Sequence, residues 1–395
     1  MTERMATVKP SATLAVSAKA TQLRTEGVDV VNFSVGEPDF PTPENIKAAA
    51  QRAIVENFTR YTPSSGIPEL RAAICEKLRA ENGLSYEPDE ILVSTGAKQS
   101  LFNFALAALE PGDEVLIPTP CWVSYQPQVS LAGAKPVFLP AGLESGFRIA
   151  PEQLAAALTP RTKALILNSP SNPTGAGYTA EHLGALADVL APTKVIVVAD
   201  EIYEKIIYDD FRFTSFAAVD PAWKARTLVV NGVSKSYAMT GWRIGYAAGP
   251  RELMSDMRKV QDHSTSNANA IAQKAALEAI SGPQEEVERM RRAFQERRDV
   301  MLTRMQAIPD VPCPKPEGAF YLFPDWRAYL GRRAGGQTLR TCVDLATYLL
   351  DEAHVAVVPG IGFEAPGHLR FSYATSNERI EAGMERVAAA VAKLS

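Results

Sequence analysis

Residues 227–245 read TLVVNGVSKSYAMTGWRIG and join a strand pattern to isolated basic residues. Residues 227–230 are apolar and largely β-branched and are followed by Gly232, which predicts a buried strand that ends just before Lys235. Arg243 follows eight residues later. Most lysines are solvated surface charges, but a lysine at the end of a buried strand can reach into a cleft and act as a nucleophile. Whether Lys235 does so depends on the sequence around it.

Similar apolar runs recur on both sides of this stretch, and helical patterns separate several of them. The strand-like runs are residues 91–94, 114–118, 163–167, 194–199 and 242–248. The helical patterns are residues 99–109, residues 179–190, and a helix expected from Pro43 onward with Thr42 as its cap. This alternation is typical of crossover units on a mostly parallel sheet. We therefore expect an α/β fold whose large domain is a mostly parallel, mixed sheet flanked by helices.

The last third of the chain follows another pattern. Residues 285–306 predict a long charged helix, and short strand and helix patterns follow it. This order predicts a second, smaller α+β domain. We expect residues 1–41 to form an N-terminal arm and part of the small domain, residues 42–283 the large, cofactor-binding domain, and residues 284–395 the rest of the small domain.

Composition narrows the possible functions. The chain has 395 residues, 46% of them apolar, and a net charge of -4, which argues against a nucleic-acid-binding surface. The four cysteines contain no CxxC pair and the four histidines share no spacing, so we expect neither a metal site nor a disulfide framework. No apolar run approaches the ~18 residues of a membrane span, and no secretory signal is recognised. A cytoplasmic protein is expected.

The loop after residues 91–94 has the features of an anion site. Gly96, Ala97 and Lys98 follow the strand and open the next helix. The first backbone amides of a helix lack intrahelical acceptors and point outward, so they bind anions such as phosphate. In an open α/β sheet, ligands bind at the carboxyl ends of the strands, where this loop is expected to lie.

Two further loops at this edge carry polar residues. Asn172 stands in an Asn-Pro-Thr-Gly turn, and this segment taken alone favours a simple loop. Asp200 ends the buried run 194–199, and Tyr203 follows three residues later. A buried carboxylate is costly unless a positive group pairs with it. Since no metal ligands cluster here, the protonated ring nitrogen of a bound cofactor is a suitable partner.

Together these residues predict a site for pyridoxal 5'-phosphate. The aldehyde of that cofactor needs a lysine such as Lys235, its pyridine nitrogen needs a carboxylate such as Asp200, and its phosphate needs donors.

The whole chain resembles the class I and II aminotransferases of fold type I, and most closely the bacterial beta-subgroup aspartate aminotransferases. The motifs that carry the resemblance are VGEPDFPTPE (35–44), YTPSSGIPELR (61–71), TGAKQSLFN (95–103), NSPSNPTG (168–175), ADEIYE (199–204), SKSYAMTGWRIGY (234–246), PEGAFY (316–321) and LRFSYA (369–374).

The resemblance implies a role for each cofactor-binding residue. Lys235 is the Schiff-base lysine and the base that moves the substrate's α-proton, Asp200 pairs with the pyridine nitrogen, and Asn172 and Tyr203 hold the phenolic oxygen. Trp122 stacks on the ring. The phosphate is held by the amides of Gly96 and Ala97, the neighbouring Lys98 residue of the same loop, Arg243, and Tyr61 of a neighbouring subunit, which implies a homodimer. Relatives often have a serine at position 232 that binds the phosphate; this chain has Gly232, and whether Ser234 compensates is open.

The resemblance also implies a substrate site. Arg370 grips the α-carboxylate, Gly36 lies in the segment that closes over the substrate, and Lys98 meets the distal carboxylate of aspartate or glutamate. Ser11 and Thr13 belong to the arm that covers it, and Trp122 and Asn172 also border the substrate. The expected reaction moves the amino group of L-aspartate or glutamate to 2-oxoglutarate or oxaloacetate.

Other readings of these motifs lead to different functions. An aminotransferase for aromatic substrates or prephenate and a β-eliminating lyase would both use the same lysine and aspartate. Both functions remain open alternatives. Residues 360–365 match G-x-G-x-x-A, but a strand pattern follows them where a dinucleotide site requires a helix. A cofactor-binding regulator is disfavoured because the chain has no basic region left for a DNA-binding module.

Overall fold

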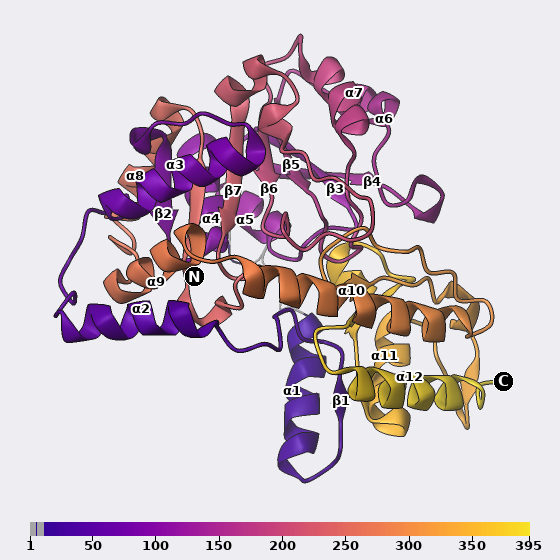
Figure 1. Ribbon diagram of the computed structural model, residues 1–395. Helices are drawn as coiled ribbons and strands as arrows, with labels where there is room; N and C mark the ends of the chain where they lie inside the picture. Colours follow the sequence, from indigo (N-terminus) through magenta and orange to yellow (C-terminus); the bar gives the residue numbers. More distant parts are fainter. Residues whose placement is uncertain (1–4, 6–11) are drawn as a thin grey trace.

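The computed structural model describes Met5 and residues 12–395, with only the backbone for residues 12–17. Its large sheet contains β2 (Ile91–Ser94), β3 (Glu114–Thr119), β4 (Lys135–Pro140), β5 (Thr162–Asn168), β6 (Ile196–Asp200), β7 (Thr227–Gly232) and β8 (Gly245–Ala248). The strand order is β2-β8-β7-β6-β5-β3-β4 (Figure 1). β8 runs antiparallel to both of its neighbours and all other pairs are parallel. The expected mostly parallel, mixed sheet is confirmed.

Helices cover both faces of this sheet, which explains why its central strands read as continuous apolar runs. Successive side chains point to opposite faces: Val197 and Val229 pack on one face, and Val198 and Val230 on the other. The first face is covered by α3 (Pro68–Asn82), α6 (Pro151–Ala157), α7 (Ala180–Leu190) and α9 (Ala270–Ser281). The second is covered by α4 (Ala97–Ala108), α5 (Tyr125–Leu131) and α8 (Arg251–Asp262).

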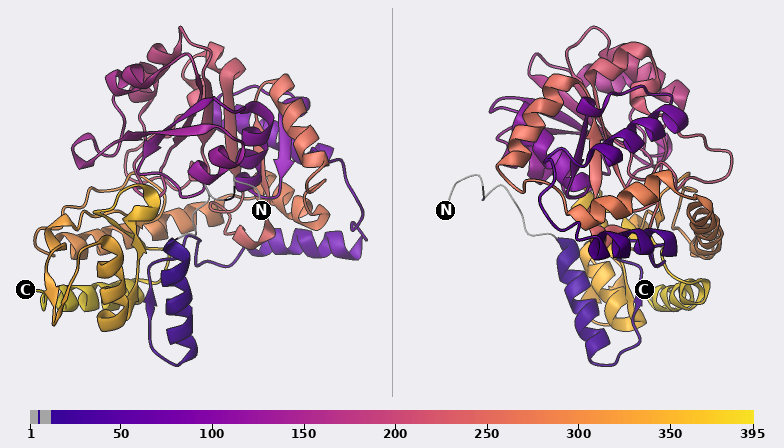
Figure 2. Two further views of the ribbon diagram at one scale, coloured as in Figure 1. Left: turned by 180° about the vertical axis from the view of Figure 1, so that it is seen from behind. Right: turned by 60° about the vertical axis from the view of Figure 1, so that its left-hand side comes forward.

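A second unit, coloured orange to yellow, lies below the large sheet in all three views (Figures 1 and 2). Its helices are α10 (Glu285–Gln306), α11 (Cys342–Ala353) and α12 (Asn377–Val391). Its small sheet has the order β13-β14-β9, with β9 (Tyr321–Leu322), β13 (Val358–Pro359) and β14 (Leu369–Ser372). A minor hairpin joins β10 (Arg333–Ala334) and β11 (Gln337–Thr338).

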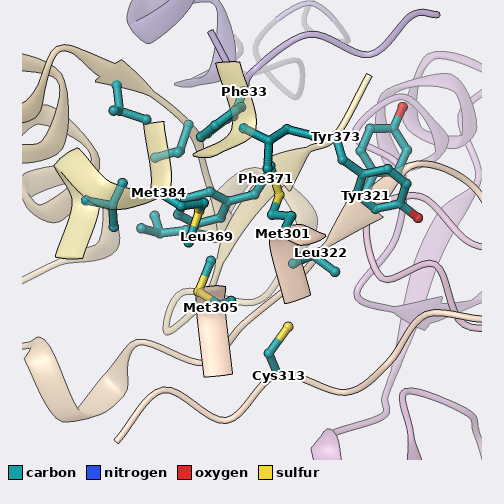
Figure 3. Close-up of a cluster of buried hydrophobic side chains, with 14 of the residues drawn as sticks. Phe33, Met301, Met305, Cys313, Tyr321, Leu322, Leu369, Phe371, Tyr373 and Met384 are labelled. Atoms are coloured by element: carbon teal, nitrogen blue, oxygen red, sulfur yellow. The ribbon is translucent and has the colours of Figure 1, made fainter. Parts of the chain in front are cut away.

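The N-terminal segment packs on this second unit. β1 (Val31–Asn32) pairs in parallel with β12 (Val355–Ala356), and α1 (Ala12–Thr25) lies beside it. Phe33 lies in one buried cluster with Met301 of α10, Phe371 of β14 and Met384 of α12 (Figure 3). The proposed domain boundaries at residues 41 and 283 stay a prediction.

Three local expectations were wrong or incomplete. α2 begins at Glu44 (Glu44–Val55) after Pro43, and the Thr42 hydroxyl donates to the Ala238 carbonyl oxygen (2.7 Å) instead of capping the helix. The last strand begins at Gly245 and not at residue 242, because Arg243 has a φ of 57° and breaks the extended backbone. β4 had no clear sequence signal, since it is a half-exposed edge strand containing two prolines.

Every helix among the described residues is too short or too polar to cross a membrane. In the same part of the chain, all four cysteines are free and no group of acidic, cysteine or histidine side chains is placed to hold a metal.

Candidate active site

One cavity of about 370 Å³ opens at the carboxyl edge of the large sheet. β5, β6 and β7 end here, α4 begins here after β2, and the antiparallel β8 starts here. Residues far apart in sequence therefore meet. The residues expected at the site that line the cavity are Gly36, Ala97, Lys98, Trp122, Asn172, Asp200, Tyr203, Ser234, Lys235, Arg243 and Arg370.

Lys235 follows β7 and directs its amine into the cavity wall. Its Nζ donates a 2.6 Å hydrogen bond to the carbonyl oxygen of Gly36, on the N-terminal segment. Burial lowers the pKa of Lys235 to about 8, the nearby Glu37 charge opposes this, and the charges of Arg370 and Arg243 add to it. A larger fraction of this amine is therefore neutral near pH 7 than for a solvated lysine, which suits a nucleophile or base.

Asp200 is the last residue of β6 and is buried. The Tyr125 hydroxyl donates to its Oδ2 (2.6 Å), and the Ile202 amide makes a longer contact with Oδ1 (3.4 Å). Burial raises the pKa of Asp200 to about 6, although the Tyr125 hydrogen bond and the Lys235 charge lower it. No arginine or lysine among the described residues forms an ion pair with it, so a cationic ring nitrogen would supply a missing partner.

The start of α4 and Arg243 form an anion-binding corner. Two features favour glycine at position 96. Its φ is 82°, which other residues rarely adopt, and a Cβ there would overlap the Arg243 guanidinium. A Cβ on Gly245 would overlap the Ala97 amide. The two glycines thus let β8 and Arg243 approach the helix N-terminus, where amide donors and a positive charge converge.

Arg370, on β14, lines the same cavity as Lys235. Its Nη1 donates to Asn172 Oδ1 and its Nη2 to the Ser34 carbonyl oxygen, both at 2.9 Å. Its buried Nε has no acceptor among the described residues. The guanidinium lies over the Tyr321 ring at 4.4 Å, and burial lowers its pKa. An unpartnered buried donor in a cavity wall favours an anionic ligand.

Aromatic groups complete the cavity. Lys98 Nζ lies 4.8 Å from the centre of the Trp122 ring, and burial together with the Arg243 charge lowers the pKa of Lys98. The hydroxyls of Tyr203 and Tyr321 are 3.0 Å apart. Burial raises the pKa of Tyr203 well above its usual value, so this hydroxyl stays protonated.

Some expected residues lie elsewhere. Gly96 borders the anion corner without lining the cavity, and Tyr61 is 93% exposed. Ser11 lies outside the described residues, as does the side chain of Thr13. At Gly232, a Cβ would lie 2.9 Å from the Gly245 Cα, so a serine side chain at this position would force the backbone to shift.

Sequence reasoning missed several lining residues. Asn168 ends β5, donates to the Asp200 carbonyl oxygen (2.8 Å) and accepts from the Asn172 amide (2.8 Å). A polar residue ending the apolar run 163–167 was a usable signal for it. Ser34 contributes a backbone carbonyl and Tyr125 a contact from another strand's loop, which no local pattern shows.

The residues present fit pyridoxal phosphate. The anion corner suits a phosphate and the Lys235 amine suits an aldehyde. Asp200, which forms no ion pair among the described residues, suits a protonated pyridine. These three groups line one cavity.

Comparison with known proteins agrees with this geometry. Residues 28–387 match the family model for aminotransferase class I and II. The chain is 52% identical to the aspartate/prephenate aminotransferase of Cereibacter sphaeroides, covering 100% of this chain and 99% of that protein. The crystal structure of the aspartate aminotransferase from Rhizobium meliloti superimposes with a TM-score of 0.96 at 48% identity, covering 100% and 99% of the two chains. The Thermus thermophilus aspartate aminotransferase with maleate superimposes with a TM-score of 0.92 at 46% identity, covering 99% of each chain. The expected resemblance is confirmed: the chain belongs to the class I and II aminotransferases, enzymes that use pyridoxal 5'-phosphate.

Proposed function

We propose that this enzyme moves the α-amino group of L-aspartate, or of glutamate, to 2-oxoglutarate or oxaloacetate in a ping-pong reaction. The observation that carries the proposal is the pair of cationic side chains, Arg370 and Lys98, in the cavity that also holds Lys235. One cation can bind the α-carboxylate and the other a distal carboxylate. The printed names of the relatives and the maleate complex of the Thermus enzyme support a dicarboxylate substrate.

The bound cofactor supplies an aldehyde that takes up amino groups and a ring that accepts the electrons released at the substrate's Cα. Lys235 would hold the cofactor, and its amine, once free, would act as the base that moves the proton at the substrate's Cα. The lowered pKa of Lys235 supports this second role. Asp200 would keep the proton on the pyridine nitrogen. This electrostatic interaction should stabilise the transition state by roughly 3 kcal/mol.

The remaining contacts orient the cofactor. We assign the anion corner, made by the backbone amides of Gly96, Ala97 and Lys98 and the side chain of Arg243, to the phosphate, with Ser234 beside it. Trp122 stacks on the ring, and Asn172 and Tyr203 hold the phenolic oxygen. The 2.9 Å bond from Arg370 to Asn172 Oδ1 fixes the Asn172 amide, so its nitrogen remains available as a donor.

Arg370 binds the α-carboxylate of the substrate. Its free Nε and its buried setting between Tyr321 and Phe363 support this role. The Gly36 carbonyl oxygen accepts a hydrogen bond from the Lys235 amine, so the N-terminal segment lies beside the reacting lysine. We assign this segment to cover the substrate and exclude water when the site closes. Ser11 and Thr13 are assigned to the same cover.

The enzyme acts as a homodimer in the cytoplasm. Tyr61 reaches the phosphate at the partner's site; its 93% exposure, next to Ile54 (54%) and Val55 (80%), supports a covered surface in the assembly. Four free cysteines are consistent with a reducing compartment.

Prephenate is a second candidate acceptor. The name of the Cereibacter relative includes it, and Val123, Val358 and Phe363 give the cavity an apolar side that suits a bulky ring.

The test is to add L-aspartate, L-glutamate, L-alanine and L-phenylalanine separately to the purified holoenzyme without any keto acid. Conversion of the cofactor absorbance to its amine form at low concentrations of the acidic amino acids supports the proposal. Conversion by neutral or aromatic amino acids alone contradicts the assignment of Lys98, and release of ammonia without conversion indicates a lyase.

A further inference from the structure

Tyr125, the first residue of α5, has a hydroxyl that reaches the end of β6. Its side chain is 1% exposed, and its hydroxyl donates the short 2.6 Å hydrogen bond to Asp200 Oδ2. Trp122 packs edge-on against the Tyr125 ring, with centroids 5.4 Å apart and planes at 79°. Trp122, which we assign to the cofactor ring, therefore also helps to hold the Tyr125 ring.

The hydrogen bond has a defined direction. Burial and the Asp200 charge raise the pKa of Tyr125 well above its usual value, so the hydroxyl keeps its proton and Asp200 accepts. A donor to a carboxylate favours the ionised form, whereas burial disfavours it. The other groups facing Asp200 are Lys235 from the loop after β7 and Tyr203 from the loop after β6; Cys121 lies near Tyr125. Lys235 changes its role during catalysis, whereas the Tyr125 hydroxyl can donate to Asp200 throughout the reaction.

We propose that Tyr125 is the positioning residue for Asp200, holding its carboxylate ionised and in one orientation so that it can keep a proton on the cofactor's ring nitrogen. Tyr125 lines the cavity, and its proposed role is exerted through Asp200. The inference rests on the proposed roles of Asp200 and the cofactor, and not on which amino acid is the substrate.

The first test compares Tyr125→Phe with the wild-type protein by titrating cofactor-free protein with pyridoxal phosphate between pH 5 and 8. The cofactor dissociation constant should rise toward low pH as Asp200 becomes protonated. In Tyr125→Phe this rise should begin about one to two pH units higher, because a hydrogen bond to a charged group has been lost. With aspartate, kcat should fall about 10- to 100-fold while KM stays within about two-fold.

Tyr329→Phe is the matched control. Tyr329 is also buried, and its hydroxyl donates to the Pro309 carbonyl oxygen (3.0 Å) away from the cavity. This variant also loses one buried hydroxyl hydrogen bond, but to a neutral acceptor, so it should leave the cofactor titration unchanged.

A double-mutant cycle with Asp200→Asn separates positioning from packing. If Tyr125 acts through the carboxylate, Tyr125→Phe should change cofactor affinity by less than about two-fold in the Asp200→Asn background. An equal loss in both backgrounds, or the same pH profile for Tyr125→Phe and wild type, would overturn the proposal.

If Tyr125→Phe fails to fold, 3-fluorotyrosine at position 125 keeps the shape and makes the hydroxyl a stronger donor. The rise in dissociation constant should then begin at lower pH, and an unchanged profile would refute the role. A wild-type protein that binds cofactor but does not transaminate aspartate would disprove the proposed substrate. The cofactor titrations of wild type and Tyr125→Phe would still test the role of Tyr125.

Discussion

Arg370 on β14 donates from Nη1 to Asn172 Oδ1 at 2.9 Å, across 198 residues of chain. The bond connects the smaller sheet to the loop after β5 of the large sheet. Because Nη2 of the same guanidinium holds the Ser34 carbonyl oxygen, three segments meet at Arg370. A carboxylate bound there would contact the residue that joins all three, so substrate binding and closure of the site are coupled through one side chain.

Arg370→Lys should raise KM for every amino acid substrate about 100-fold, since lysine cannot make two parallel hydrogen bonds to a carboxylate and would leave buried acceptors unpaired. Steady-state kinetics with aspartate and alanine measure this effect. Arg386→Lys, on α12 where the arginine pairs with Asp29 at the surface, is the control. A loss confined to aspartate would contradict the assignment of Arg370 to the α-carboxylate.

Lys98→Met should lower kcat/KM for aspartate about 10- to 100-fold, because a charge-assisted contact to the distal carboxylate is lost. The value for alanine, which lacks that carboxylate, should change little. Lys259→Met, at an exposed position of α8, serves as the comparison. Equal losses with aspartate and alanine would assign Lys98 to the cofactor phosphate alone.

Asp200→Asn should stabilise the cofactor-free protein while it inactivates the enzyme. The folded pKa of Asp200, about 6, lies above its usual value of 3.8, so the ionised carboxylate lowers the free energy of unfolding at any pH above 6. The cost is about 3 kcal/mol and disappears as the pH falls from 6 to below 3.8. Urea unfolding should therefore show a more stable variant at pH 7.5 and a shrinking difference toward pH 4. A variant less stable than wild type at pH 7.5 would refute this account.

Mixing two inactive variants should restore activity if Tyr61 serves the partner's site. In a mixed dimer both changes then affect the same site: Lys235→Ala removes its amine, and Tyr61→Ala on the other subunit removes its phosphate contact. Random two-fold heterodimers contain one intact site, so an equal mixture should regain about a quarter of wild-type activity after subunit exchange. Refolding the mixture and assaying transamination measures this; no recovery, with exchange shown by tagged subunits, would place Tyr61 in its own subunit's site or outside both.

Gly245→Ala should weaken cofactor binding, because the new Cβ would overlap the Ala97 amide and push β8 away from the start of α4. Gly241→Ala is its control, since a Cβ there meets nothing within 4 Å. Titration of both cofactor-free variants with pyridoxal phosphate gives the comparison. Unchanged affinity for Gly245→Ala would show that the close approach is not needed.

Much of the fold could be predicted because its signals are local. Strands buried on both faces are apolar along their whole length, and the runs at residues 91–94, 114–118, 163–167 and 227–230 lie within the strands found. Boundaries shifted where one residue's backbone decided them, as at Arg243. The half-exposed edge strand β4 was missed because pairing with β3, and not its own pattern, makes it a strand.

For the site, the sequence by itself determined which chemical groups are present and that Asp200 and Lys235 follow adjacent apolar runs, since both facts depend on neighbouring residues. Only the tertiary structure decided their partners: the Tyr125 hydroxyl on Asp200, the Gly36 carbonyl on Lys235, and the bond between Arg370 and Asn172. Each of these contacts joins segments brought together by strand order and packing, and their 2.6–2.9 Å distances depend on how whole layers fit. No local sequence pattern predicts these distances between distant segments.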